Sequence, residues 1–297
     1  MPPGPLPQNT NPRSRVKVPL SVIVPIRNEA ANLPGCLSSL QWADQLYVVD
    51  SHSQDGSAAI AQAFGAEVVQ FEFHSPWPKK KNWALQTLPF RHDWVLLIDA
   101  DETMPAPAEE EIREIVTSPA PPHAGYWINR RFHFMGDWLR HAYYPNWNLR
   151  LFRHRLGRFE KLTDLETESG DVEIHEHVHV QGSTGRLRCE MDHYAFPSVE
   201  AFVDKHNRYS NWEARLALSV PGANHAPQTR ALRWRRFLKR AARRLPARPV
   251  LRFLYIYVLQ LGFLDGRRGF YFASLHAYYE FLSLLKTIEL KEAAKSK

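Results

Sequence analysis

The stretch Trp94-Val-Leu-Leu-Ile-Asp-Ala-Asp-Glu102 joins a buried-strand pattern to two closely spaced carboxylates. Its five apolar residues run without interruption, as in a central strand of a parallel sheet that is covered on both faces. Asp99 and Asp101 follow directly, where ligands of parallel sheets bind. Two hard oxygen donors suit Mg²⁺ or Mn²⁺, which in turn bind phosphates. An Asp-x-Asp alone more often marks an acidic turn before a helix, so its meaning depends on the rest of the chain.

The segments upstream repeat a strand, loop and helix pattern. Residues 20–25, 45–50 and 67–71 are short runs typical of strands, and the first two are followed by polar turns and helical spacing. A further helical stretch precedes Trp94. Strands that alternate with helices in this way predict an α/β fold whose parallel sheet gathers carboxylates along one edge.

Length and composition limit the class of protein. The chain has 297 residues, 44% of them hydrophobic, which suits one large domain or a domain of about 200 residues with an appendage. Cys36 and Cys189 lack the spacing of a disulfide framework or a zinc site, which favours a reducing compartment. Residues 1–17 lack the apolar core of a signal peptide, and we expect a flexible tail there.

The positive charge is concentrated near the C-terminus. The net charge is +7, and residues 214–264 carry eleven Arg or Lys with no Asp or Glu, which leaves −4 for the rest. This asymmetry predicts a catalytic body over residues 18–212 and a basic helical appendage over 213–297.

Three motifs then make the chain recognisable. They are Val24-Pro-Ile-Arg-Asn-Glu29, Val48-Val-Asp-Ser-His-Ser-Gln-Asp-Gly-Ser57 and Leu97-Ile-Asp-Ala-Asp-Glu102. In this order they resemble the nucleotide-sugar-binding half of family 2 glycosyltransferases, which have the GT-A fold. No Gly-x-Gly-x-x-Gly or P-loop motif competes for the nucleotide.

The resemblance implies a place for each residue of the donor pocket. It implies a base and ribose pocket lined by Pro25, Arg27 and Glu29, with Asp50 on the uracil or ribose and Asp99 near the ribose. We therefore expect a nucleotide sugar, UDP-linked, to bind along this sheet edge.

The resemblance also implies a metal site. Asp101 would bind the Mn²⁺ or Mg²⁺ that bridges the diphosphate, and His193 is the candidate to complete the metal shell, as a His does in several GT-A enzymes. The alternative for His193 is a plain surface or core histidine. Lys81 lies where the family places groups near the donor, while the alternative for residues 79–81 is a solvated helix face.

Residues 172–180 contain a formal His-Glu-x-x-His match at His175, Glu176 and His179. That metalloprotease motif requires a helix, whereas the apolar residues here alternate as in a strand. On a strand Glu176 shares the apolar face, which would raise its pKa toward the range of a general base. A satisfied or edge-exposed Glu is the ordinary alternative, but the family resemblance makes Glu176 the predicted catalytic base, with Glu173 or Asp171 next.

Later segments narrow the resemblance to the bacterial lipopolysaccharide-core glucosyltransferase branch of family 2. They are residues 192–194, the helical residues 198–212, and Asp265-Gly-Arg-Arg-Gly-Phe270. The resemblance implies inverting transfer of a hexose, glucose by tendency, to a hydroxyl of a lipid-anchored saccharide. The runner-up is a polyprenyl-phosphate sugar transferase, whose phosphate acceptor is already ionised and needs no base.

The C-terminal part predicts membrane association. Residues 230–245 form a basic amphipathic helical pattern, and the apolar stretches 250–264 and 270–285 are too short or too polar to span a bilayer of about 30 Å. We expect them to lie in the interface, with Arg and Lys facing anionic headgroups on the cytoplasmic face of the inner membrane. Nucleic-acid binding is the alternative of another class, but the aromatic residues follow the apolar stripe and do not alternate with the arginines.

Overall fold

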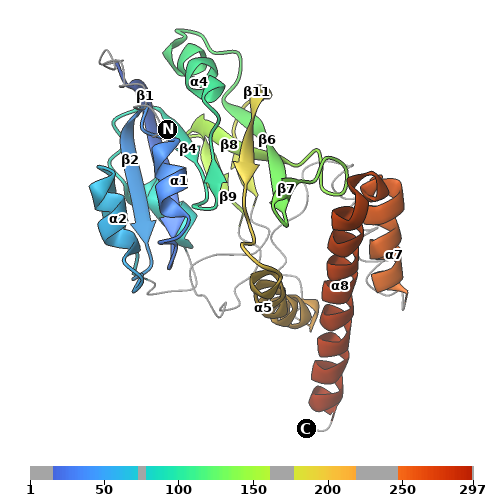
Figure 1. Ribbon diagram of the computed structural model, residues 1–297. Coiled ribbons are helices and arrows are strands. Elements are labelled where there is room, and N and C mark those ends of the chain that lie inside the picture. Colours follow the sequence, from blue (N-terminus) through green and yellow to red (C-terminus); the bar gives the residue numbers. More distant parts are fainter. Residues whose placement is uncertain (1–15, 73–77, 161–176, 219–246, 296–297) are drawn as a thin grey trace, which may run out of the picture.

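The computed structural model describes residues 16–72, 78–160, 177–218 and 247–295. A large sheet carries helices on its faces, and two C-terminal helices stand beside it (Figure 1). The strands are β1 (Val18–Ile26), β2 (Ala43–Asp50), β3 (Glu67–Gln70), β4 (Trp94–Leu97), β5 (Glu102–Thr103), β6 (Gly125–Phe134), β7 (Asp137–Trp138), β8 (Trp147–Arg153), β9 (Gly157–Phe159), β10 (Val178–Val180) and β11 (Thr184–His193). The helices are α1 (Leu33–Ser38), α2 (Ser57–Ala63), α3 (Lys80–Thr87), α4 (Pro107–Thr117), α5 (Val199–Leu218), α7 (Arg248–Leu254), the π-helix η1 (Tyr255–Leu259), the 3₁₀-helix η2 (Gly262–Asp265) and α8 (Gly266–Lys295).

The sheet has the strand order β3-β2-β1-β4-β8-β6-β11-β5. Its first four strands are parallel, so the carboxyl ends of β1, β2 and β4 meet at one edge. The second half is mixed, because β8 runs antiparallel to β4 and β6, whereas β11 is parallel to β6. The predicted α/β architecture is confirmed, and its parallel half is the part that carries the motifs.

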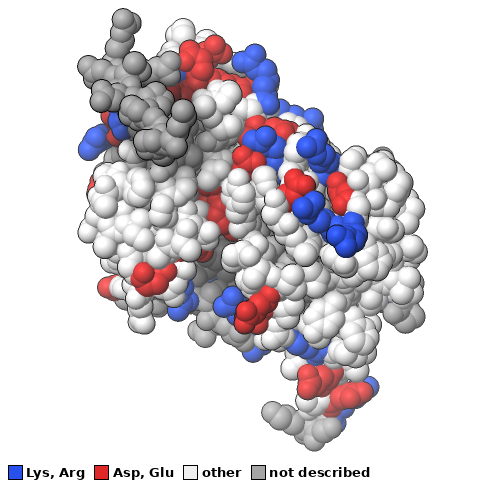
Figure 2. All heavy atoms as spheres, viewed as in Figure 1, with Lys and Arg blue, Asp and Glu red and all other residues white. Residues whose placement is uncertain are grey.

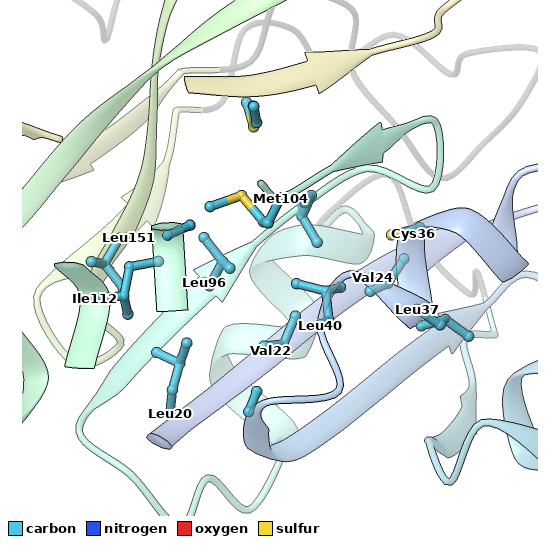
Figure 3. Packing of buried hydrophobic residues seen from close by; sticks show 14 of the residues in the cluster. Leu20, Val22, Val24, Cys36, Leu37, Leu40, Leu96, Met104, Ile112 and Leu151 are labelled. Carbon is cyan, nitrogen blue, oxygen red and sulfur yellow. The ribbon is translucent and has the colours of Figure 1, made fainter. Parts of the chain in front are cut away.

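The strand β4 lies at the centre, as its composition requires. All four of its residues are buried, and Val22, Leu96 and Leu151 from three neighbouring strands contribute to one core. Figure 3 shows this cluster between the sheet and the helices, with Leu37 of α1 and Ile112 of α4 closing it. A second cluster covers the opposite face with Val95, Leu97 and residues of α3. Burial on both faces explains the uninterrupted apolar run.

The C-terminal helices form a hairpin that is fixed to the sheet by Asp265. The carboxylate of Asp265 accepts hydrogen bonds from the backbone N–H groups of residues 140–142, at 2.8–3.1 Å, and lies 3.0 Å from His141 Nδ1. A Cβ on Gly269 would overlap the carbonyl oxygen of Gly262, so the tight turn needs glycine. Asp265-Gly-Arg-Arg-Gly-Phe270 therefore has a structural role: it holds the hairpin against the loop between β7 and β8.

A third core cluster joins the hairpin to the body. Phe272 and Ile256 are buried against Phe132 of β6 and Phe202 of α5. The helix expected over residues 198–212 is present as α5, which runs on to Leu218 and buries Phe202 and His206. The proposed boundary at residue 212 stays a prediction. The predicted basic helix over 230–245 lies outside the described residues.

The outer face of the hairpin is apolar. Leu259 is 74% exposed, and Val250, Leu254 and Val258 of α7 and η1 are exposed as well. The surface at the right of Figure 2 is largely free of charge, whereas the C-terminal end of α8, at the bottom of the view, carries acidic and basic side chains. Of the helices in the described ranges, none is both long and apolar enough to span a bilayer.

Candidate active site

The predicted carboxylates lie beyond the carboxyl ends of parallel strands. Asp50 ends β2 opposite Ile26 of β1, and Asp99 follows β4. Glu29, Asp99 and Asp101 are close enough to affect one another's pKa values, so strands separated by many residues bring them together. Asp50 accepts hydrogen bonds from the backbone and hydroxyl of Ser53 and from Gln70 Nε2.

The first two motifs hold each other in place. The backbone N–H groups of Asn28, Glu29 and Ala30 donate to side chains of the second motif, at 2.8–2.9 Å. Asn28 has a φ of 55°, in the left-handed region that an Asn tolerates. These bonds explain why the polar turn after β2 accompanies the loop after β1. Arg27 is exposed on this loop and Pro25 is half-buried at the end of β1.

Glu29 has a raised pKa, in contrast to Asp99 and Asp101, whose pKa values are lowered. Burial raises its pKa, and the hydrogen bond from Asn32 Nδ2 at 2.7 Å lowers it only in part. Asp101 adds to the increase. Glu29 is therefore a partly buried carboxylate that can accept hydrogen bonds from hydroxyl or amide groups of a ligand.

Asp99 is ionised and held by two cations. Arg150 NH2 is 2.5 Å from one carboxylate oxygen and Lys81 Nζ is 3.6 Å from the other. Burial alone would raise the pKa of Asp99, but Arg150 and then Lys81 hold it well below its usual range. One third of the side chain remains exposed, which leaves it accessible to a ligand.

Glu102 is a site residue that the motif analysis did not single out. Its side chain is fully buried, and one oxygen lies 2.6 Å from Arg150 and 3.0 Å from Arg130. The other oxygen accepts a hydrogen bond from the backbone N–H of Asp99 at 2.9 Å. Glu102 thus fixes both the backbone and the cationic partner of Asp99. The only sequence signal was its place in the Asp-Ala-Asp-Glu run.

The lysines before β4 are not a solvated face. Lys79 and Lys80 are almost completely buried, and Lys80 Nζ donates to the carbonyl oxygen of Ile26 at 2.7 Å. Lys81 lies 5.4 Å from the centre of the Phe159 ring in addition to its ion pair with Asp99. The solvated-face alternative is wrong because α3 packs against β1 and β9. The carboxyl ends of β1, β2 and β4, with the carboxylates that follow them, are called the donor edge below, after the predicted ligand.

Asp101 and His193 lie together although 92 positions separate them in the numbering. His193 Nε2 is 3.5 Å from Asp101 Oδ2, and Lys205 Nζ is 4.0 Å from the same oxygen. Burial alone would raise the pKa of Asp101, but His193 and Lys205 bring it below its usual value. The pairing of β11 with β5 sets this contact, since His193 is opposite Glu102.

A carboxylate suits Mn²⁺ or Mg²⁺, and Mg²⁺ sites commonly use one or two carboxylates together with substrate phosphates. The buried Nδ1 of His193 has no hydrogen-bond partner among the described residues. Those residues contain no group of three or more His, Cys, Asp and Glu that would hold an ion. Asp101 and His193 thus fit one side of an ion that takes its other ligands from phosphate and water.

Glu176, the predicted base, lies outside the described residues. The strand that follows it is described: Val178, His179 and Val180 form β10, antiparallel to β9. The end of the His-Glu-x-x-His match is therefore extended, which agrees with the rejection of the helical zinc motif.

The chain is similar to known proteins of one family. The model of Glycosyl transferase family 2 matches residues 21–171. The lipopolysaccharide core biosynthesis glycosyltransferase LpsC of Rhizobium meliloti is 28% identical over 280 residues, covering 91% of this chain and 92% of its own. An uncharacterized glycosyltransferase of Rickettsia prowazekii is 26% identical, covering 91% and 87%.

Solved structures are also similar. Residues 1–349 of Staphylococcus aureus TarS are 14% identical, with 93% of this chain and 91% of that chain covered and a TM-score of 0.45. Glucosyl-3-phosphoglycerate synthase of Mycobacterium tuberculosis, in a complex with Mn²⁺, UDP and glucosyl-3-phosphoglycerate, is 24% identical over 38% of this chain and 44% of that chain, with a TM-score of 0.29.

Proposed function

The chain belongs to glycosyl transferase family 2, and from this premise we propose that it moves a hexose, glucose by preference, from a UDP-linked donor to a hydroxyl of a lipid-linked saccharide such as lipopolysaccharide core. The observation that carries the proposal is that Asp99 and Asp101 follow β4, within the family match, and that His193 lies 3.5 Å from Asp101. The name of LpsC supports the choice of acceptor.

Each donor-site residue has a defined task in this proposal. Ionised Asp99, held by Arg150 and Lys81, accepts hydrogen bonds from ribose hydroxyls. Asp101 and His193 would hold the divalent metal. When bound, that metal would neutralise charge on the diphosphate leaving group. Glu29 and Asp50 lie at the neighbouring strand ends, where the uridine would bind.

The acceptor side needs one base. We propose Glu176, which would remove the proton of the acceptor hydroxyl as its oxygen attacks the anomeric carbon and the bond to diphosphate breaks. A single displacement inverts the configuration at that carbon.

The proposed location is the cytoplasmic face of the inner membrane, where the protein would bind peripherally. The exposed apolar residues of α7 and η1 and the basic composition of residues 214–264 support this location. A lipid-linked acceptor would then be presented at the same surface.

Calorimetry with UDP and Mn²⁺, combined with a sugar-transfer assay, tests the proposal. Asp101→Ala should bind UDP no better with Mn²⁺ than without it, while Asp44→Ala, at the opposite end of β2, should behave like the parent. Glu176→Gln should lose about 10²–10⁴ in turnover with nearly unchanged UDP affinity. Metal-dependent UDP binding by Asp101→Ala would show that the site is misassigned. Parent-like turnover of Glu176→Gln would move the base elsewhere or favour a phosphate acceptor.

A further inference from the structure

Lys205 is a charged side chain that reaches the donor edge from α5, a helix outside the sheet. It lies on α5, and its Nζ is 4.0 Å from Asp101 Oδ2 and 5.3 Å from the centre of the Phe196 ring. The side chain is 35% exposed. It is therefore held at the site by one ion pair and one ring contact, with part of it open to a ligand.

Acidic and polar groups surround Lys205. Asp101 Oδ2 is 4.0 Å from its ammonium, and Tyr209 and Glu29 are also close enough to interact with it. Tyr209 lies one helical turn further along α5, on the same side of the helix. The same face of α5 thus turns two polar groups toward the three carboxylates of the donor edge.

The C-terminal hairpin holds α5 in place through contacts made by α8. Lys286 Nζ of α8 lies within 3.0 Å of four acceptors on α5, in Asn207, Ser210 and Asn211. The His206 ring stacks on Phe202, 3.7 Å between centroids, and meets Tyr279 of α8 edge-on. Figure 1 shows α5 below the sheet and next to α8. Lys205 is consequently positioned in advance.

The charges of the site indicate what Lys205 would meet. Asp99 already has two cations within 3.6 Å, whereas Asp101 has the lysine ammonium of Lys205 at 4.0 Å and the imidazole of His193 at 3.5 Å. A divalent ion held by Asp101 and His193 would neutralise the carboxylate of Asp101 in place of Lys205. The ammonium of Lys205 would then lie beside the phosphates of the donor. An ammonium is a compact point charge with three donors, well suited to phosphate oxygens.

We propose that Lys205 is a direct cationic contact of the donor diphosphate, which it holds in the ground state and stabilises further as the leaving group departs. In that step the bond from the anomeric carbon to the diphosphate oxygen breaks, and its electron pair passes to that oxygen. The acceptor oxygen bonds to the anomeric carbon and its proton passes to the base. The charge of the diphosphate therefore increases, and a fixed cation binds it more tightly in the transition state. The inference rests on the proposed function.

Lys205→Met, Lys205→Arg and Arg208→Met form a matched set, because Arg208 is exposed on the same helix. With Mn²⁺ present, Lys205→Met should bind UDP about 10- to 100-fold more weakly and uridine like the parent, since a hydrogen bond to a charged group is lost. Its kcat should fall as well, and Lys205→Arg should recover part of both. Arg208→Met should match the parent.

Parent-like UDP affinity and kcat of Lys205→Met would overturn the inference, and so would an equal loss of uridine and UDP, which would indicate a structural role. Asp101→Ala separates this failure from that of the proposed function. If Asp101→Ala loses metal-dependent binding while Lys205→Met binds UDP normally, only the role of Lys205 is wrong. If the parent itself does not bind UDP, the proposed function fails.

A second measurement needs no variant. On the parent protein, UDP with Mn²⁺ should protect Lys205 from an amine-acetylating reagent, followed by mass spectrometry. Lys291, exposed on α8, should react equally with and without nucleotide. Unchanged acetylation of Lys205 would also overturn the inference.

Discussion

The donor edge and the C-terminal hairpin place charged and apolar groups in opposite ways. At the donor edge, fully buried Glu102 and nearly buried Arg150 form part of a chain of ion pairs behind Asp99. In the hairpin, large apolar side chains such as Leu259 are exposed. Neither arrangement is what folding stability alone would select. The difference agrees with the two partners proposed above, a polar nucleotide at the donor edge and an apolar surface at the hairpin.

The two regions should respond differently to the loss of one side chain. Removing a partner from a buried ion network leaves an uncompensated charge, whereas removing an exposed apolar group changes few interactions of the folded chain. The following predictions test this difference, from the largest expected effect on stability to the smallest.

Arg150→Met should lower the free energy of unfolding by about 3–5 kcal/mol, because Asp99 and Glu102 both lose their shared cation. Urea unfolding measures this change. The matched control is Arg153→Met, on the same strand, whose ion pair with Asp93 is well exposed and whose loss should cost less than about 1 kcal/mol. Equal costs for the two variants would show that the buried network has no special weight.

Acid should loosen the contact between α5 and α8. Burial lowers the pKa of His206 from 6.5 to about 4, and the pKa of His276 beside it is also lowered well below its usual value. A depressed pKa means that the unfolded chain binds more protons below pH 6.5, so stability is complete above that pH and falls as the pH drops toward 4. His206 alone accounts for up to about 3 kcal/mol.

Urea unfolding at several pH values measures this effect. The titratable groups that face His206 are Lys205, Tyr209, Tyr279 and His276. His206→Phe should flatten the dependence between pH 6.5 and 4, whereas His179→Gln, at a largely exposed position, should leave it unchanged. A slope that is the same in His206→Phe and the parent contradicts the assignment.

Lys286→Met should cost about 1–3 kcal/mol, since the polar groups of α5 that accept from its ammonium lose that donor. Lys291→Met, five residues further along α8 and exposed, should stay within about 0.5 kcal/mol of the parent. Thermal unfolding of both variants decides whether the hairpin is joined to α5 through this lysine. Identical melting curves would mean that the aromatic contacts suffice.

The double variant Leu259→Ser with Phe263→Ser should leave stability within about 0.5 kcal/mol but should no longer float with anionic vesicles at low salt. The parent should float and should be released by high salt, which screens headgroup attraction. Val16→Ser removes an exposed apolar residue at the other end of the chain and should float like the parent. If the double variant floats normally, the apolar surface has another partner.

The sequence by itself determined the elements and the motifs of the donor half. The apolar run at Trp94 is a fully buried strand, and the carboxylates after β2 and β4 lie at the shared edge. These features could be predicted because burial on two faces imposes a continuous apolar pattern and because parallel strands end at one edge. The family resemblance named Asp101 and His193 together, and the structure brings their side chains to 3.5 Å, while their role as metal ligands stays a prediction.

Only the tertiary structure decided which charges compensate one another. Arg150 is 51 positions from Asp99, and Lys205 reaches Asp101 from a helix that follows the sheet. No local pattern marks such partners, because a side chain's partner depends on strand order and helix packing and not on spacing along the chain. The burial of Lys79 and Lys80 is of the same kind: a run of lysines predicts solvent exposure, and the packing of α3 against β1 and β9 overrides it.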